Sequence, residues 1–175
     1  TDALPILDDN PSLSESVIDR YKRMYSGVFY DRFIRGLWVL SEGVIFDNFD
    51  KGTMVKEPPN GVQPSKHYVS IDYGTQNATV FLLWGKYGDK WYCIDEYYYS
   101  GRDESRQKTD AEYSRALKEF LGDISAKVIV DPSAASFIAQ LKEDGFKVVK
   151  AKNSVLDGIR ATQTAMNQND IFFSS

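Results

Sequence analysis

Residues 69–84, "VSIDYGTQNATVFLLW", contain two apolar runs joined by a polar turn, and this stretch decides the fold. Side chains alternate along an extended strand, so Val69 and Ile71 point to one face and Asp72 points to the other. Asp and Gly are poor strand residues, so the first strand is predicted to end at Asp72 and Gly74. A carboxylate at the carboxyl end of a buried strand lies where open sheets usually bind ligands. The simpler interpretation is that Asp72 only begins a turn, and this stretch alone leaves both open.

From residue 66 onward, the pattern predicts a mixed α/β sheet with helices on both faces. Three antiparallel strands come first, at about 67–72, 78–84 and 91–99, and the last two are joined by a turn containing Gly88. Helices and strands then alternate. The predicted elements are a helix opened by the capping box Thr109-x-x-Glu112, a strand at 127–131, a helix at 132–145, a strand at 146–151, a helix opened by Ser154 and a short strand at 170–173.

The first 65 residues are predicted to form a separate helical connector followed by a linker. The capping box Ser12-x-x-Glu15 precedes apolar residues at helical spacing. The stretch "KEPPNGVQPSK" (56–66), with three prolines and a glycine, is typical of a linker or long loop. We therefore expect two parts, 1–65 and 66–175.

Composition limits the classes of protein to consider. The 175 residues are 42% hydrophobic and 14% aromatic, which is typical of a globular chain. No apolar run is long enough for a membrane span, and the acidic, polar start does not predict a signal peptide. The single cysteine, Cys93, is expected to be a buried hydrophobe, and the single His67 makes a zinc site improbable. A net charge of −4 argues mildly against a protein that coats nucleic acid, but leaves open an enzyme that holds metal with acids.

A second acid has the same setting as Asp72. Asp131 ends the buried run "VIV" and is followed at once by Pro132 and Ser133, which begin a helix. If the two strands are neighbours, a spacing of about 4.8 Å would let both carboxylates share a cation. Such carboxylates repel one another, so Mg²⁺ or Mn²⁺ is the natural partner, and two such ions can promote phosphodiester cleavage. Singly, Asp72 is explained by a turn and Asp131 by a helix N-cap; together they favour a metal site.

The order of elements, with acids on the first and fourth strands, resembles the ribonuclease H-like nuclease fold. Several segments are more narrowly similar to the large terminase subunits of tailed bacteriophages. Residues 10–50 resemble the connector that follows the ATPase domain. "YVSIDYGTQNATVFLLW", "VIVDPSAASFIAQL" and "KNSVLDGIRATQTAMNQNDIFF" resemble, in order, the carboxy-terminal nuclease domain. The resemblance implies a metal-dependent endonuclease that uses Asp72 and Asp131 with Mg²⁺ or Mn²⁺ to cut concatemeric double-stranded viral DNA. It further implies a small terminase subunit and a portal as partners, no membrane, and the host cell cytoplasm as the location.

The resemblance has two gaps. The chain contains no GxxxxGK[ST] phosphate loop, so these residues are not predicted to form the packaging ATPase. The family also has a third catalytic carboxylate in a His-x-x-Asp-Ala-like stretch after the last strand, which nothing here matches, so we expect the domain at 66–175 to lack its final segment. Auxiliary candidates are Glu96, next to Asp95 at the expected end of the third strand, and Thr75. Asp157 is another, although the capping pair Ser154-x-x-Asp157 explains it without catalysis.

Two groups of basic residues are candidates for contact with DNA phosphates. The first group is Lys147, Lys150, Lys152 and Arg160, and the second is Arg102, Arg106 and Lys108. Ordinary solvated charge is the simpler explanation for any one of them. The motif "IDYGT" also leaves two other functions open. One is a phosphate-binding domain like those of sugar kinases and actin-like ATPases, although Asp131 is followed by Pro-Ser-Ala-Ala rather than a glycine pair. The other is a non-catalytic scaffold in packaging.

Overall fold

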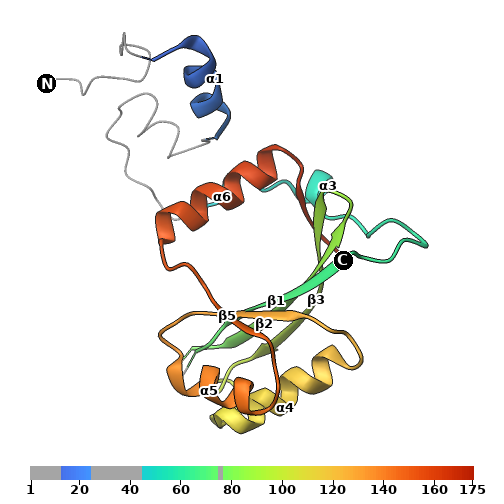
Figure 1. Ribbon diagram of the computed structural model, residues 1–175, viewed down its shortest axis with the longest axis vertical. Helices are drawn as coiled ribbons and strands as arrows, with labels where there is room; N and C mark the ends of the chain where they lie inside the picture. The colour runs from blue at the N-terminus through green and yellow to red at the C-terminus, as the bar shows by residue number, and fades with distance from the viewer. Residues whose placement is uncertain (1–12, 25–44, 75–76) are drawn as a thin grey trace, which may run out of the picture. The chain divides into compact units, whose positions relative to one another are not determined.

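The structure, a computed structural model, describes residues 13–24, 45–74 and 77–175 (Figure 1). The predicted cap at Ser12 and the candidate Thr75 lie outside these residues. The contacts divide the chain into two compact units. The first contains the described part of Thr1–Met54 together with Ser154–Ile171, and the second contains Val55–Asn153 and Phe172–Ser175. The last long helix therefore belongs with the amino-terminal part, whereas the predicted division was 1–65 and 66–175.

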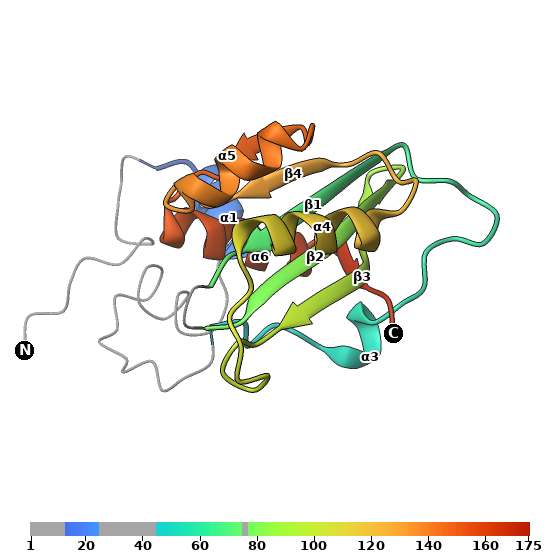
Figure 2. The same ribbon diagram turned by 90° about the horizontal axis from the view of Figure 1, so that it is seen from below.

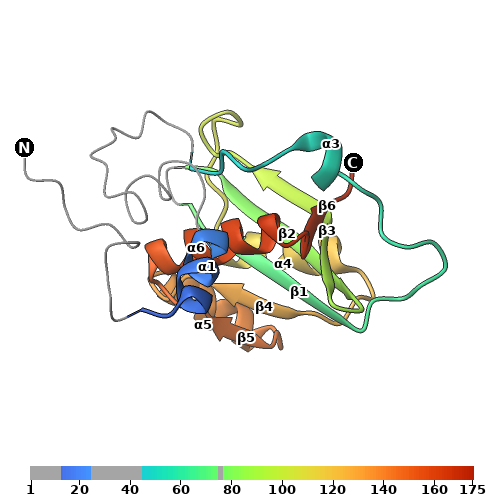
Figure 3. The ribbon, with the colours of Figure 1, turned by 90° about the horizontal axis from the view of Figure 1, so that it is seen from above.

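A six-stranded mixed sheet carries the fold, in the order β5-β4-β1-β2-β3-β6 (Figure 3). β1 is antiparallel to β2 and β2 to β3, as expected for the predicted meander, whereas β1 is parallel to β4 and β4 to β5. The strands are β1 (Lys66–Asp72), β2 (Thr79–Tyr87), β3 (Lys90–Tyr99), β4 (Lys127–Val130), β5 (Val148–Lys150) and β6 (Ile171–Phe173). All six were predicted, with small differences at their ends.

One face of the sheet is covered by α4 (Asp110–Leu121) and α5 (Ala135–Glu143), which lie side by side in Figure 2. The core consists of alternate residues of the central strands packed against the inner faces of these two helices. Val69 and Ile71 of β1 pair with Leu83 and Phe81 of β2, so the four side chains share this face. Helical cover of the opposite face remains a prediction.

Two local signals, the turn at Gly88 and the cap at Thr109, are confirmed. Gly88 has a positive φ of 60° in the two-residue turn between β2 and β3, a conformation that costs glycine little. Thr109 caps α4 as predicted: its hydroxyl accepts the N–H of Glu112, and the Glu112 carboxylate accepts the N–H of Thr109. These bonds satisfy donors that the first turn of a helix leaves without partners.

The first unit contains α1 (Glu15–Met24), α3 (Lys51–Met54) and α6 (Val155–Asn167). α1 contacts α6, as Figure 3 shows. Gln163 of α6 is fully buried and donates a hydrogen bond of 2.9 Å to the carbonyl oxygen of Ile45. Asn48 donates to the carbonyl oxygen of Gln163 and to the side chain of Asn167. In the part of the chain that the structure describes, no helix is both long and apolar enough to cross a membrane.

Candidate metal centre

Asp72 and Asp131 lie side by side at the carboxyl ends of the neighbouring strands β1 and β4. β1 and β4 are adjacent and parallel, and their last paired residues are Ile71 and Val130. Asp72 and Asp131 each follow one of these residues, so they occupy equivalent positions on strands that are about 4.8 Å apart. The two strands are therefore neighbours, as the shared-cation hypothesis requires. A role in holding metal remains a proposal.

Alternation along the two strands predicts that both carboxylates are directed to the same side of the sheet. Ile71 and Val130 are buried in the core with α4 and α5. Because side chains alternate along a strand, the next residue on each strand is directed to the opposite face, away from these helices. Asp72 is exposed and Asp131 is half-buried, so solvent and hydrated ions reach this edge.

Asp131 is held by a turn as well as by its strand. Its Oδ1 accepts a 2.7 Å hydrogen bond from the N–H of Ser133 and a longer one, 3.4 Å, from the side-chain amide of Asn153. The side chain and backbone of Ser133, followed by Asn153, hold the pKa of the Asp131 carboxyl below its usual range. The group is therefore ionised near neutral pH, which is the form that binds a hard cation. The N-cap of α5 is Ala134, so the simpler interpretation of Asp131 as that cap is wrong.

The segment after Asp72 is anchored by contacts that the sequence pattern did not reveal. The ring of Tyr73 stacks on Phe137 of α5, and its hydroxyl donates a 2.5 Å hydrogen bond to Asp110 of α4. The hydroxyl of Thr79 bridges the segment by accepting the N–H of Gly74 and donating to its carbonyl oxygen, each over 3.2 Å. Because Thr79 is fully buried, it fixes the return of the chain into β2.

Glu96 does not lie at the edge that carries Asp72 and Asp131. The predicted strand at 91–99 agrees with β3, which continues to Tyr99, so the further expectation that Asp95 and Glu96 end this strand is wrong. Glu96 pairs with Leu82, so β2 lies between it and β1, and it is about 12 Å from Asp72. An ion whose ligands lie about 2.0–2.6 Å away cannot be shared over that distance. Within β3, the Asp95 carboxylate accepts a 2.8 Å hydrogen bond from the N–H of Glu96.

Asp157 belongs to the first unit, and its own contacts explain its position. It lies in the first turn of α6, where its carboxylate accepts a 2.5 Å hydrogen bond from the hydroxyl of the N-cap residue Ser154. The predicted pair therefore forms, but Ser154 makes no side-chain hydrogen bond to the backbone of the helix. Arg160 lies 3.6 Å from the same carboxylate. Neighbours in the chain thus account for the charge of Asp157.

The candidate basic residues do not form a single group. Lys150 pairs with Val130, and the next residue, Ala151, donates its N–H to Val130, so Lys150 and Lys152 are near the Asp131 edge. Lys147 precedes β5 and lies at the opposite end of the sheet. Both Lys150 and Lys152 are exposed, and they remain the candidates best placed to meet a phosphate near the acids. Arg160 is in the first unit and is half-buried.

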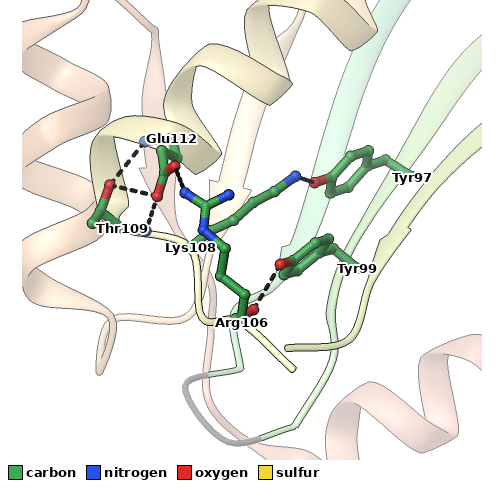
Figure 4. Close-up of polar contacts among 6 residues, drawn as sticks. All are labelled: Tyr97, Tyr99, Arg106, Lys108, Thr109 and Glu112. Atoms are coloured by element: carbon green, nitrogen blue, oxygen red, sulfur yellow. Dashed lines mark hydrogen bonds and ion pairs between the residues drawn. The ribbon is translucent and has the colours of Figure 1, made fainter. Parts of the chain in front are cut away.

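Two members of the second basic group, Arg106 and Lys108, make contacts within the protein, which Figure 4 shows. The ammonium group of Lys108 lies 4.0 Å from the ring centroid of Tyr99 and donates a 2.7 Å hydrogen bond to the hydroxyl of Tyr97. Arg106 forms an ion pair with Glu112, and its carbonyl oxygen accepts the hydroxyl of Tyr99. These contacts hold the segment before α4 against β3.

Two further predictions concern residues away from the acid pair. Cys93 is buried as expected, and burial, with a smaller effect of Glu96, raises the pKa of its thiol to about 11. The thiol is therefore neutral at physiological pH and is a poor nucleophile or metal ligand. Among the described residues, no group of three or more His, Cys, Asp or Glu side chains is arranged to hold a metal ion. The described part of the chain thus offers a pair of carboxylates at the edge.

Two bacteriophage proteins are similar to most of this chain. The terminase large subunit of Escherichia phage T5 is 26% identical, and the match covers 93% of this chain and 38% of that protein. The large terminase of a thermophilic bacteriophage is 54% identical with a TM-score of 0.83, and the match covers 97% of this chain and 42% of that chain. This chain resembles phage large terminases. It spans about two-fifths of the length of these terminases, and no protein-family model matches it.

More distant terminase structures share the fold. The nuclease domain of the P22 large terminase matches with a TM-score of 0.60 at 17% identity, over 76% of this chain and 73% of that one. The large terminase nuclease of thermophilic phage G20c, in a structure with bound cobalt, matches with a TM-score of 0.55 at 16% identity, over 74% and 73%. The predicted resemblance to terminase nuclease domains and the predicted ribonuclease H-like fold are both confirmed.

Proposed function

We propose that this chain is the nuclease part of a phage large terminase, which cuts concatemeric double-stranded DNA during genome packaging. The observation that carries the proposal is that Asp72 and Asp131 each follow the last paired residue of two adjacent parallel strands. The similarity to the T5 protein and to the 54% identical large terminase supports the packaging role, and the small terminase subunit and portal are the partners proposed with it. The host cell cytoplasm is the proposed location.

The chemistry of the donors fits Mg²⁺ or Mn²⁺. Both ions prefer oxygen ligands, and Asp72 and Asp131 supply carboxylate oxygens at an accessible edge. The G20c nuclease was solved with cobalt and with zinc, which supports a divalent ion in this fold. When bound, two such ions supply the charge that activates water and stabilises the leaving oxygen in phosphodiester hydrolysis.

Residues of this chain then bind and orient the reacting groups. Asp72 and Asp131 hold the ions at one edge of the sheet, and the turn at Ser133 keeps Asp131 ionised. Lys150 and Lys152, which lie toward the same edge, are proposed to bind phosphates on either side of the scissile bond. The third carboxylate implied by the family has no match in these 175 residues, so two-metal occupancy is proposed for the site with that ligand added.

The test is cleavage of supercoiled plasmid with Mn²⁺ by a wild-type chain that also supplies the third carboxylate, and by the same chain carrying Asp72→Ala or Asp131→Ala. We expect each variant to lose cleavage and to show weaker Mn²⁺ binding in calorimetric titrations. Asp95→Ala is the matched control, because Asp95 is an exposed acid in the middle of β3. Cleavage by Asp72→Ala or Asp131→Ala at the wild-type rate would contradict the assignment.

Thermal unfolding without metal separates loss of chemistry from loss of fold. Asp72 is exposed, so Asp72→Ala should leave stability unchanged within about 0.5 kcal/mol, or raise it if the two carboxylates repel one another. Asp131→Ala also loses the hydrogen bond to the Ser133 N–H, so its melting temperature should be the lower of the two. A variant that still melts cooperatively but does not cut DNA has lost a group needed for cleavage.

A further inference from the structure

A basic hollow lies at the end of the sheet opposite to Asp72 and Asp131. It has a volume of about 230 Å³ and is open to solvent. The residues that line it are Lys66, His67, Tyr68, Ser125, Ala126, Lys127 and Lys147. Three lysines and the only histidine of the chain are thus gathered here, in a protein with a net charge of −4.

The sheet fixes the positions of these side chains. Lys66 begins β1, and Lys127 begins β4 opposite Tyr68. The carbonyl oxygen of Lys147 accepts a 3.0 Å hydrogen bond from the N–H of Val128, which holds Lys147 at the same end. The three lysines therefore come from three neighbouring segments and lie near the amino ends of β1, β4 and β5.

The charges around the hollow are not neutralised within the described part of the chain. None of the residues that line it carries a carboxylate. No ion pair between described residues involves Lys66, Lys127 or Lys147, all of which are exposed. Like charges that face one space repel one another, and an anion placed between them relieves that repulsion.

We propose that this hollow binds backbone phosphates of duplex DNA at a distance from the cleavage site. The proposal rests on the proposed nuclease function. Lysine ammonium groups are point charges that suit phosphate contacts without base recognition. An open, shallow site with exposed lysines suits the surface of a long polyanion better than an enclosed small molecule, which a pocket would bury.

The distance from the acids sets the role of the hollow. Lys66 and Asp72 are six residues apart on β1 (72 − 66), which corresponds to about 20 Å. Lys127 and Asp131 are four residues apart (131 − 127), which corresponds to about 13 Å. A phosphate held in the hollow is therefore not the one that is cut. Contacts there strengthen binding of DNA in both the ground state and the transition state, so their loss raises KM and leaves kcat unchanged.

The first test measures DNA binding by fluorescence anisotropy in EDTA, at several salt concentrations, with a short labelled duplex. We expect the double variant Lys127→Ala/Lys147→Ala to bind several-fold more weakly than wild type. The slope of log K against log salt should become shallower by about 2, since each phosphate contact contributes about 0.9. The charge-matched control is Arg115→Ala/Lys142→Ala, because both residues are exposed on α4 and α5. Equal slopes in the two double variants would overturn the proposal.

The second test uses His67 as a reporter, because its imidazole resonance is unique in a tag-free chain. Duplex DNA without divalent metal should shift this resonance in wild type and in Arg115→Ala/Lys142→Ala, and not in Lys127→Ala/Lys147→Ala. Inorganic phosphate is the second probe. If inorganic phosphate shifts the His67 resonance at the same concentration of phosphate groups as duplex DNA does, the hollow binds small phosphate ions. That result would overturn the DNA assignment.

These measurements are independent of cleavage. If the wild-type chain that also supplies the third carboxylate fails to cut DNA with Mn²⁺, but the salt slopes differ as expected, the proposed nuclease function is wrong and the proposed DNA site is supported. If plasmid is cut but both double variants bind and cut alike, the nuclease function stands and the hollow is not a DNA site. Equal melting temperatures of the two double variants show that the comparison does not reflect unfolding.

Discussion

The ring of Tyr73 stacks on the ring of Phe137, with 4.7 Å between the centroids and 17° between the planes. The hydroxyl of Tyr73 donates a hydrogen bond to Asp110, and burial raises the pKa of this hydroxyl well above its usual range. Tyr73 therefore remains protonated as a donor at all physiological pH values. Because Tyr73 directly follows Asp72, these contacts tie the end of β1 to α5 and α4.

Replacing Tyr73 should weaken metal binding indirectly. Tyr73→Phe keeps the stacked ring and loses the hydrogen bond, which should cost about 1 kcal/mol in the free energy of unfolding. Tyr73→Ala also loses the ring and should cost about 2 kcal/mol or more. Urea denaturation gives these values, and calorimetry should show Mn²⁺ affinity falling in the same order. Tyr98→Phe is the control, because Tyr98 is 61% exposed. Mn²⁺ affinity unchanged in folded Tyr73→Ala would show that the anchor does not position Asp72.

Gly74 is predicted to tolerate no larger residue. A Cβ at this position would lie 2.5 Å from the carbonyl oxygens of Asn77 and Ala78, closer than van der Waals contact allows. Gly74→Ala should therefore displace the segment between Asp72 and Thr79, lower the melting temperature by several degrees and reduce Mn²⁺-dependent cleavage.

The matched control for Gly74→Ala is Gly158→Ala. Gly158 lies within α6, and a Cβ there meets no atom within 4 Å. Alanine is favoured over glycine inside a helix by about 1 kcal/mol, so Gly158→Ala should raise stability slightly. A Gly74→Ala protein with wild-type stability and cleavage would show that the segment can move without cost.

The strands and the position of each acid at a strand end could be predicted because both depend on short-range patterns. Apolar runs and alternation predicted the strands, whereas the adjacency of β1 and β4 was only a condition of the shared-cation hypothesis. Glu96 was misplaced because its charged neighbour Asp95 imitates the end of a strand, whereas β3 continues through Tyr97 to Tyr99. An exposed face in the middle of a strand accepts charge as readily as a strand end does.

The sequence pattern could not predict contacts between segments that are distant in the chain. Tyr73 and Phe137 are 64 positions apart (137 − 73), and neither residue type nor spacing indicates their stacking. Lys147 and Lys150 are close in the chain, yet they lie at opposite ends of the three-residue strand β5, about 10 Å apart. Grouping charges by sequence therefore fails wherever a strand runs between them.

The turn at Ser133 predicts how metal binding depends on pH. Because Ser133 lowers the pKa of Asp131, the carboxylate keeps its charge until the pH falls through this lowered pKa. Ser133→Ala removes the hydroxyl and keeps the backbone hydrogen bond, so the pKa should rise part of the way to its ordinary value. The acid limb of Mn²⁺ binding should then move to higher pH, as measured by titrations between pH 3 and 7.

Ser136→Ala is the control for Ser133→Ala, since Ser136 is exposed in the first turn of α5. The pH range in which Ser136→Ala loses Mn²⁺ affinity on acidification should be the same as in wild type. If Ser133→Ala coincides with wild type as well, the hydroxyl does not set the charge of Asp131, and the backbone N–H of Ser133 is the dominant hydrogen bond.

The two groups of basic residues should respond differently to substitution. Lys108 contacts Tyr97 and Tyr99, so Lys108→Ala should lower stability by about 1 kcal/mol and leave the salt dependence of DNA binding unchanged (Figure 4).

Lys150→Ala/Lys152→Ala removes two exposed charges near Asp131 and should leave stability within about 0.5 kcal/mol of wild type. Its salt slope should become shallower by about 2 if both lysines meet phosphates. Anisotropy titrations measure the salt slope of DNA binding, and urea denaturation of the same preparations measures the free energy of unfolding. A shallower slope in Lys108→Ala, with none in Lys150→Ala/Lys152→Ala, would transfer the DNA contact to the segment before α4.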